Sequence, residues 1–382
     1  MIQPQKNNLN ILQGNLINSD AQTLVNTINC VGVMGKGIAL QFKEKFPEMY
    51  KDYLNRCKNG EVKLGQPYLY KPLIGKWILN FPTKDHWRSV SSIEDIVKGL
   101  EYLTGHYKEW GITSIAFPPL GCGQGQLDWK VVGHVLCKYL SKLDIPVFLY
   151  APYEIPQEQL NPDYLLSTPG EKVGLHNYPS KEWLKPAWVA LVEMLRLLEN
   201  ERYHRPIGRV IFQKLAYIST AEGLPTGLVF RKGSYGPYSD EVKAITTKLV
   251  NHGLLSEDRL GKMLPIKVGH TYEQTKGSYA DYLSEWKPKI EKIVDLFARL
   301  NTEQAEIVST VIFVSKSLEE KKKQHPDEME ILEEVMQWKL KRKPPLDTYE
   351  VAYTIRNLNA LGWLNAKPSN NLPLGEDALA VA

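Results

Sequence analysis

The chain has 382 residues, enough for two or three domains, and its 43% hydrophobic and 24% charged residues exclude a wholly disordered protein. No apolar run approaches the length of a transmembrane helix, and the first residues lack the apolar segment of a signal peptide. The four cysteines form no CxxC pair, so we expect reduced thiols in a cytoplasmic protein.

The formal net charge of +4 lies entirely in the N-terminal part of the chain. Residues 1–155 contain 17 Lys and Arg against 13 Asp and Glu, whereas residues 156–382 contain 30 of each. This excess gives mild support for an anionic ligand in the N-terminal part. It is too small for a strong general DNA-binding protein.

Short apolar strands alternate with helical segments over the first 150 residues. The predicted strands span residues 9–12, 23–28, 77–81, 114–117 and 147–150, and the predicted helices span residues 38–56, 93–110 and 129–143. Alternation of this kind favours a layered α/β domain.

Prolines punctuate residues 156–182, which we interpret as a linker. Beyond it the chain is mainly helical, with predicted helices at residues 183–199, 206–222, 240–252, 278–300, 302–317, 326–341 and 347–361. Asn301 with Gln304, and Asp347 with Glu350, predict helix N-terminal caps. Residues 263–272 alternate like a strand or wing, and the basic runs 321–323 and 339–343 are interpreted as solvated helix surface.

A first glycine-rich segment, residues 26–39, follows the predicted strand 23–28 and leads into a helix. It holds the polar and glycine residues Asn26, Asn29, Gly35, Lys36 and Gly37, followed by Ile38. Glycine lets a backbone approach a ligand closely, and a helix N-terminus offers N–H groups to a phosphate. The spacing fits neither a Walker A loop nor GxGxxG, and an ordinary glycine turn is an equal alternative for this segment alone.

A second segment of the same kind, residues 118–129, follows the predicted strand 114–117. It contains Gly121, Cys122, Gly123, Gln124 and Gly125. Two such loops in one domain suggest a diphosphate that is held from both sides. The Cys122 thiol has no obvious histidine partner, so we interpret it as structural.

Lys84 lies in a third segment, residues 80–88, which follows the predicted strand 77–81. Composition alone favours an ordinary surface lysine, but a lysine beside a phosphate site that loses its proton can act as a nucleophile. No HExxH, CxxC or paired-carboxylate spacing is present, so we expect no metal and no cofactor.

Together with residues 14–17, these three segments resemble the ligand loops of macrodomains, the ADP-ribose-binding fold. The likeness spans residues 8–152 and is greatest to the DarG antitoxin family of DarT/DarG toxin–antitoxin systems, which is related to the terminal ADP-ribose protein glycohydrolases. The resemblance implies an α/β macrodomain, with three α/β/α layers and a mixed sheet, over residues 1–155.

The same resemblance implies a function and a set of site residues. DarT toxins attach ADP-ribose to a base of single-stranded DNA, typically thymidine, and DarG macrodomains remove it. The catalytic lysine falls on Lys84. The implied ADP-ribose ligands are Gly14, Asn15, Asn26, Asn29, Gly35, Lys36, Gly37, Ile38, Thr83, Gly121, Cys122, Gly123, Gln124 and Gly125.

Two positions depart from the related patterns. Asn15 stands where many macrodomains have the aspartate that binds the adenine amino group. Gly125 stands where the relatives that act on modified proteins have a catalytic aspartate. The lysine–aspartate mechanism of those relatives therefore does not apply in full to this chain.

Residues 212–217 and 230–238 resemble the C-terminal domain of the DarG family and the broader Panacea antitoxin domain. This resemblance implies that the mainly helical residues 183–382 bind a DarT-type toxin. A basic, DNA-binding toxin would favour acidic patches on its partner, and the acidic pairs 319–320, 327–328 and 333–334 are candidate contacts, although each is equally well interpreted as solvated helix surface. The alternative is a macrodomain that reads ADP-ribose without cleaving it, fused to a winged-helix-like DNA-binding or interaction domain. Lys84 distinguishes the two interpretations, because a macrodomain that only binds ADP-ribose needs no lysine at this position.

Overall fold

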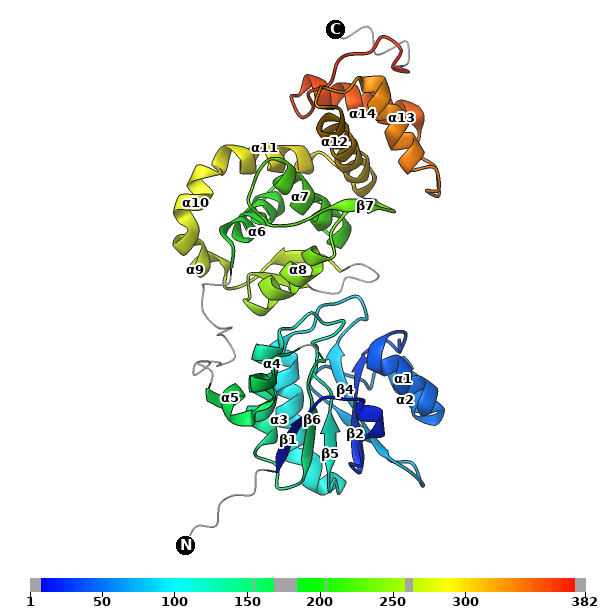
Figure 1. Ribbon diagram of the computed structural model, residues 1–382, viewed down its shortest axis with the longest axis vertical. Helices are drawn as coiled ribbons and strands as arrows, with labels where there is room; N and C mark the ends of the chain where they lie inside the picture. Colours follow the sequence, from blue (N-terminus) through cyan, green and yellow to red (C-terminus); the bar gives the residue numbers. More distant parts are fainter. Residues whose placement is uncertain (1–7, 154, 168–183, 203–204, 258–263, 375–382) are drawn as a thin grey trace. The chain divides into compact units, whose positions relative to one another are not determined.

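The computed structural model describes residues 8–153, 155–167, 184–202, 205–257 and 264–374 (Figure 1). The chain forms two compact units. The N-terminal unit comprises Met1–Trp183 with Lys243–Leu255, and the C-terminal unit comprises Leu184–Val242 with Ser256–Ala382. Within the described ranges, no helix is both long and apolar enough to cross a membrane.

The N-terminal unit is built on a six-stranded sheet with the order β1-β6-β5-β2-β4-β3. Its strands are β1 (Leu9–Leu12), β2 (Thr23–Asn29), β3 (Tyr68–Tyr70), β4 (Trp77–Lys84), β5 (Ile115–Phe117) and β6 (Val147–Tyr150). All neighbouring strands are parallel except β3, which runs antiparallel to β4. The sheet is therefore mixed, as expected.

Helices cover both faces of this sheet (Figure 1). Helices α1 (Gly37–Lys45) and α2 (Pro47–Lys58) pack on one face, and α3 (Ile93–Trp110) and α4 (Trp129–Leu140) pack on the other. Successive strand residues point to opposite faces, so Leu24 joins the core under α1 and α2, while Val25 joins the core under α3 and α4. The three-layer macrodomain fold is confirmed.

Two predicted elements of this unit were wrong in extent. The helix predicted over residues 38–56 is two helices, because Phe46 leaves the helical region (φ −128°, ψ 66°) and Pro47 starts the next helix. The strand predicted to stop at Phe81 continues to Lys84, paired along β2 up to Asn29. Lys84 is thus the last residue of a strand and not part of a turn.

The first part of the predicted linker carries helical structure. It contains the 3-10 helix η2 (Gln157–Leu160) and helix α5 (Pro162–Ser167), which packs on α4. Leu165 is buried, a Cβ atom built on Gly133 of α4 would lie 3.2 Å from its Cδ1, and its carbonyl oxygen lies 2.7 Å from His134 Nδ1. Residues 168–183 lie outside the described residues, so the predicted domain boundaries at 155 and 183 stay predictions.

The C-terminal unit is mainly helical. Its helices are α6 (Pro186–Glu199), α7 (Arg209–Ala221), α9 (Tyr272–Lys276), α10 (Ala280–Glu285), α11 (Lys287–Ala298), α12 (Thr302–Lys322), α13 (Glu328–Trp338) and α14 (Thr348–Ala360). The short strands are β7 (Arg231–Gly233), β8 (Gly236–Tyr238), β9 (Leu255–Glu257) and β10 (Ile266–Val268), whereas most of helix α8 (Glu241–Asn251) lies in the segment Lys243–Leu255 of the N-terminal unit. Strand β10 confirms a strand within residues 263–272.

The predicted caps of two helices are confirmed. Asn301 and Gln304 form a reciprocal capping box at α12, and the Asp347 side chain accepts a hydrogen bond from Glu350 N at α14. The helix predicted over residues 278–300 is divided, since Pro288 stands in the first turn of α11 and ends the run of α10 before it.

Candidate active site

Lys84 ends strand β4 at the carboxyl edge of the sheet, opposite Asn29 of β2. Its Nζ donates a hydrogen bond to the Gln124 carbonyl oxygen at 2.8 Å. The backbone N–H of Cys30 contacts the carbonyl oxygens of Lys84 at 3.1 Å and Asp85 at 3.0 Å. The structure therefore brings the predicted catalytic lysine together with the start of the first glycine-rich loop and the middle of the second, where open α/β sheets bind ligands.

Asn29 organises the first glycine-rich loop from inside. Its Oδ1 accepts hydrogen bonds from Val31 N at 3.1 Å and Val33 N at 3.3 Å, and its Nδ2 donates to Val33 O at 2.5 Å. The buried Tyr53 donates its hydroxyl to Asn29 O at 2.8 Å. Asn29 thus shapes the loop, and Tyr53 is a supporting residue that sequence reasoning missed, because only the packing of α2 on β2 brings it there.

The N-terminus of α1 follows this loop. Lys36 is its N-cap residue and makes no side-chain cap hydrogen bond. Gly37 has φ +58°, and a Cβ atom built there would meet no atom within 4 Å. The N–H groups of the first turn of α1, next to Gly35 and Ile38, suit an anionic ligand.

The second glycine-rich loop is closed by its own backbone. Leu127 N donates to Gly121 O at 3.1 Å, and Gln126 N donates to Gly123 O at 3.0 Å. A Cβ atom at Gly125 would clash with Gly121 O and lie 2.6 Å from Ser91 Oγ, whereas one at Gly123 would meet nothing within 4 Å. Gly125 is therefore needed for the shape of the loop, and Gly123 faces open space.

Cys122 and Ser91 lie beside this loop, and neither is assigned a direct chemical role. Burial raises the pKa of the Cys122 thiol well above its usual range, and Cys122 Sγ lies 3.8 Å from Leu120 O. A neutral thiol is a poor nucleophile, which favours the structural interpretation of Cys122. Ser91 carries a buried hydroxyl oxygen next to Gly125, and no sequence signal singled it out.

Asn26 and Thr83 lie inside the sheet and not among the loops. Asn26 is fully buried, and its Nδ2 donates to Oδ1 of the equally buried Asn80 on β4 at 2.9 Å. Thr83 is buried, with its hydroxyl 3.5 Å from Ile28 O. Successive residues of a strand point to opposite faces of the sheet, so Thr83, next to Lys84, points into the core.

Gly14 and Asn15 follow β1, at the same carboxyl edge, with the strands β6 and β5 between β1 and β2. Gly14 has φ +148°, and a Cβ atom there would lie 3.7 Å from the Tyr150 ring. Asn15 is exposed, and its Oδ1 accepts a hydrogen bond from Ile17 N at 3.1 Å as the cap of the 3-10 helix Leu16–Asn18. Within the described residues, no group of three His, Cys, Asp or Glu side chains is placed to hold a metal ion.

Comparison with known proteins places this site in a family. Residues 25–136 match the Macro domain. The DNA ADP-ribosyl transferase–DNA ADP-ribosyl glycohydrolase fusion protein of Thermosipho africanus is 42% identical over 42% of this chain and 47% of that protein. The DNA ADP-ribosyl glycohydrolase of Thermus aquaticus is 36% identical over 64% of each chain.

A third relative is shorter. Human ADP-ribose glycohydrolase OARD1 is 30% identical over 31% of this chain and 73% of that protein. The chain spans about half of the fusion protein and just under two thirds of the Thermus aquaticus protein. From the three-layer fold, the glycine-rich loops and these relatives, we conclude that the chain belongs to the macrodomain family.

Proposed function

We propose that the N-terminal unit hydrolyses the N-glycosidic bond between ADP-ribose and a DNA base, with Lys84 as its catalytic residue. The observation that carries this proposal is the hydrogen bond from Lys84 Nζ to Gln124 O at 2.8 Å, which joins the lysine to the second glycine-rich loop. The names of the Thermosipho and Thermus relatives support the same activity.

The diphosphate of ADP-ribose is the group that the two glycine-rich loops suit. The first turn of α1 presents N–H groups on one side, and Gly123 leaves open space on the other. A diphosphate fixed there holds the distal ribose near Lys84, so the scissile bond and the catalytic group are oriented before reaction. The open positions at Gly37 and Gly123 support this placement.

In the overall reaction, water supplies a hydroxyl to the anomeric carbon and a proton to the base nitrogen, while the C–N bond breaks and its electron pair stays with the base. Lys84 can serve this reaction as a nucleophile, as a group that stabilises the departing base, or as a group that opens the ribose. As a neutral amine, it attacks the anomeric carbon and is later replaced by water. As an ammonium group, it stabilises the departing base.

Single-stranded DNA modified on a base, typically thymidine, is the proposed substrate. Trp87, three residues after Lys84, is 47% exposed, and the Arg88 guanidinium carbon lies 4.5 Å from the centre of its ring. An exposed aromatic ring beside a cation is the usual platform on which an unpaired base stacks. This feature favours a nucleic-acid substrate over a modified protein.

We further propose that the C-terminal unit binds and neutralises a DarT-type ADP-ribosyltransferase. The Thermosipho relative is named as a fusion of a transferase and a glycohydrolase, so the two activities occur together in one protein. The C-terminal unit of the present chain has a buried core of its own, which suits a separate binding role.

Replacement of Lys84 tests the hydrolase. Lys84→Ala should slow release of ADP-ribose from an ADP-ribosylated oligonucleotide at least about 100-fold, because one group that gives nucleophilic or acid–base help contributes that much. Affinity for free ADP-ribose, measured by calorimetry, should change little. Lys130→Ala, which removes an exposed lysine from α4, is the matched control.

Lys84→Arg separates the first two routes. Arginine keeps a positive charge but does not lose its proton, so substantial remaining activity favours the ammonium route, and loss equal to that of Lys84→Ala favours the neutral amine. Near-normal turnover by Lys84→Ala would refute the assignment of Lys84.

A further inference from the structure

The hairpin of β7 and β8 presents an exposed tyrosine at its tip. Its register pairs Gly233 with Gly236, so the loop between the strands consists of Ser234 and Tyr235 alone. The Tyr235 side chain lies on the surface, and the residue is 66% exposed. Val229 and Tyr238, at the other end of the hairpin, are exposed as well.

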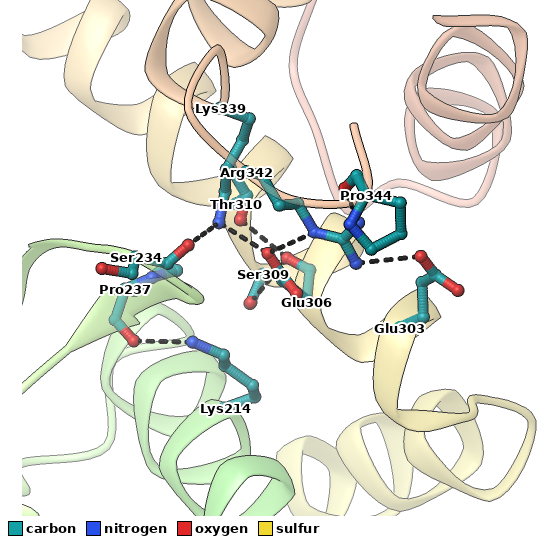
Figure 2. Close-up of polar contacts among 10 residues, drawn as sticks. All are labelled: Lys214, Ser234, Pro237, Glu303, Glu306, Ser309, Thr310, Lys339, Arg342 and Pro344. Carbon is teal, nitrogen blue, oxygen red and sulfur yellow. Dashed lines mark hydrogen bonds and ion pairs between the residues drawn. The ribbon is translucent and has the colours of Figure 1, made fainter. Parts of the chain in front are cut away.

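Two buried lysines hold the backbone on either side of this tyrosine (Figure 2). Lys339, at the end of α13, donates to the carbonyl oxygen of Ser234 at 3.0 Å. Lys214, from α7, donates to the carbonyl oxygen of Pro237 at 2.9 Å. Their exposed fractions are only 4% and 2%, so both ammonium groups are withdrawn from water.

Gly236 shows how closely the hairpin packs on α12. It has φ +91°, and a Cβ atom there would lie 2.8 Å from Thr310 Oγ1 and 3.0 Å from Lys214 Nζ. A side chain at this position would therefore push the tip away from α12. The glycine and the two lysines therefore hold the backbone of the tip against α7, α12 and the end of α13.

Lys339 also belongs to a network of charges centred on the buried Glu306 (Figure 2). Glu306 of α12 accepts from Lys339 Nζ at 2.7 Å and from Arg342 Nε at 3.3 Å. Arg342 also donates to Glu303 at 2.9 Å. Buried charges are unfavourable unless they are paired, and here their pairing ties α12, the end of α13 and the hairpin tip together. The tip is therefore rigid as well as exposed.

The surface around the tip has the chemistry of a protein-binding site. Its apolar members are Val229, Tyr235 and Tyr238, and Leu340, which directly follows Lys339, is exposed too. The cations of the hairpin already have carboxylate partners, since Arg231 pairs with Asp240 and Lys232 pairs with Glu334. Paired cations bind phosphate less strongly, so the surface favours a protein over a nucleic acid.

We propose that Tyr235 is the anchor side chain through which the C-terminal unit binds its ADP-ribosyltransferase partner, with the ring in an apolar pocket of that enzyme. This inference rests on the proposed binding of the transferase. A rigid, exposed tyrosine loses little conformational freedom on binding, which is why preorganised aromatic side chains dominate many interfaces. The exposed Val229 and Tyr238, at the other end of the hairpin, add apolar surface beyond the anchor.

The test uses the full chain and the purified transferase, with affinity measured by calorimetry. Tyr235→Ala should raise the Kd at least about 30-fold, as expected for the loss of an anchor residue. Tyr349→Ala is the matched control, because Tyr349 is 57% exposed on α14 and lies outside the hairpin. Its Kd should stay within about threefold of the wild-type value, the range of peripheral substitutions.

Each outcome bears on a different claim. Absence of any complex with the wild-type chain overturns both the proposed transferase binding and the role of Tyr235. A wild-type complex that Tyr235→Ala leaves intact overturns only the anchor. If Tyr235→Ala instead lowers affinity for an unmodified single-stranded oligonucleotide and not for the transferase, the hairpin binds nucleic acid and the proposal is wrong.

Discussion

Gly123 and Gly125 stand two residues apart in the second glycine-rich loop, yet the structure gives them different tasks. Gly123 faces open space, whereas Gly125 lies against Gly121 O and Ser91 Oγ. Gly123 therefore affects the access of a ligand, whereas Gly125 affects the fold of the loop. Composition alone makes the two positions equivalent.

This difference predicts opposite results for two substitutions. Gly123→Glu should abolish ADP-ribose binding in calorimetry while the melting temperature stays near the wild-type value, because a Cβ atom at this position has no protein atom within 4 Å and the carboxylate repels the diphosphate. Gly125→Ala should lower the melting temperature by several degrees, since a clash with backbone costs about 1–3 kcal/mol. Unchanged affinity in Gly123→Glu would mean that this loop does not hold the ligand.

At the scale of elements, the β7–β8 hairpin shows how buried charge fixes a surface structure. Burial, and then the nearby charge of Lys339, lower the pKa of Lys214 from 10.5 to about 7, while Glu306 acts in the opposite direction. Burial also lowers the pKa of Lys339. Part of the folded population thus holds Lys214 as a neutral amine near pH 7, still able to donate to Pro237 O.

The lowered pKa predicts a stability that rises with pH. Between pH 7 and 10.5 the unfolded chain binds more protons at Lys214 than the folded chain, so raising the pH through this window stabilises the fold. Lys214→Met lacks this linkage, while both chains keep Lys339 and Glu306. The unfolding free energy of the wild type relative to Lys214→Met should therefore increase by about 2 kcal/mol from pH 7 to pH 9.

Calorimetric unfolding of both full chains at the two pH values measures this difference. A difference between wild type and Lys214→Met that stays constant with pH would show that Lys214 keeps an ordinary pKa in the folded chain.

At the scale of the whole molecule, the two proposed activities depend on different units. Lys84 belongs to the N-terminal unit and Tyr235 to the C-terminal unit. Of the acidic residues suggested as transferase contacts, Glu328 is fully buried and binds Arg356, Asn359 and Ser369, so it is not available to a partner. This suggestion from the sequence was wrong for Glu328.

Because each proposed activity is assigned to its own unit, we predict that a substitution can remove one activity and leave the other. With the transferase and its oligonucleotide, Lys84→Ala should still limit formation of ADP-ribosylated DNA by binding the enzyme, but should not remove ADP-ribose already attached. Tyr235→Ala should show the reverse, and the double variant should lose both effects. Loss of hydrolysis in Tyr235→Ala alone would contradict the separation.

Local patterns were sufficient for much of the fold and for the position of the site. Five of the six strands of the N-terminal sheet, the two glycine-rich loops, Lys84 and the capping box of Asn301 with Gln304 follow from short-range signals, namely apolar periodicity, glycine and cap spacing, whereas β3 was missed. The macrodomain resemblance from these motifs is confirmed by the Macro domain match. The roles of the site residues stay predictions.

Contacts between segments far apart in the chain decided the rest. Pairing with β2 extends β4 to Lys84 and buries Asn26 against Asn80. Lys339 was interpreted as solvated surface, because a basic run is usually exposed, but Glu306, 33 residues earlier, pairs with it in the interior. Burial and pairing depend on which distant residues share a neighbourhood, and a periodic pattern along one segment carries no information about that.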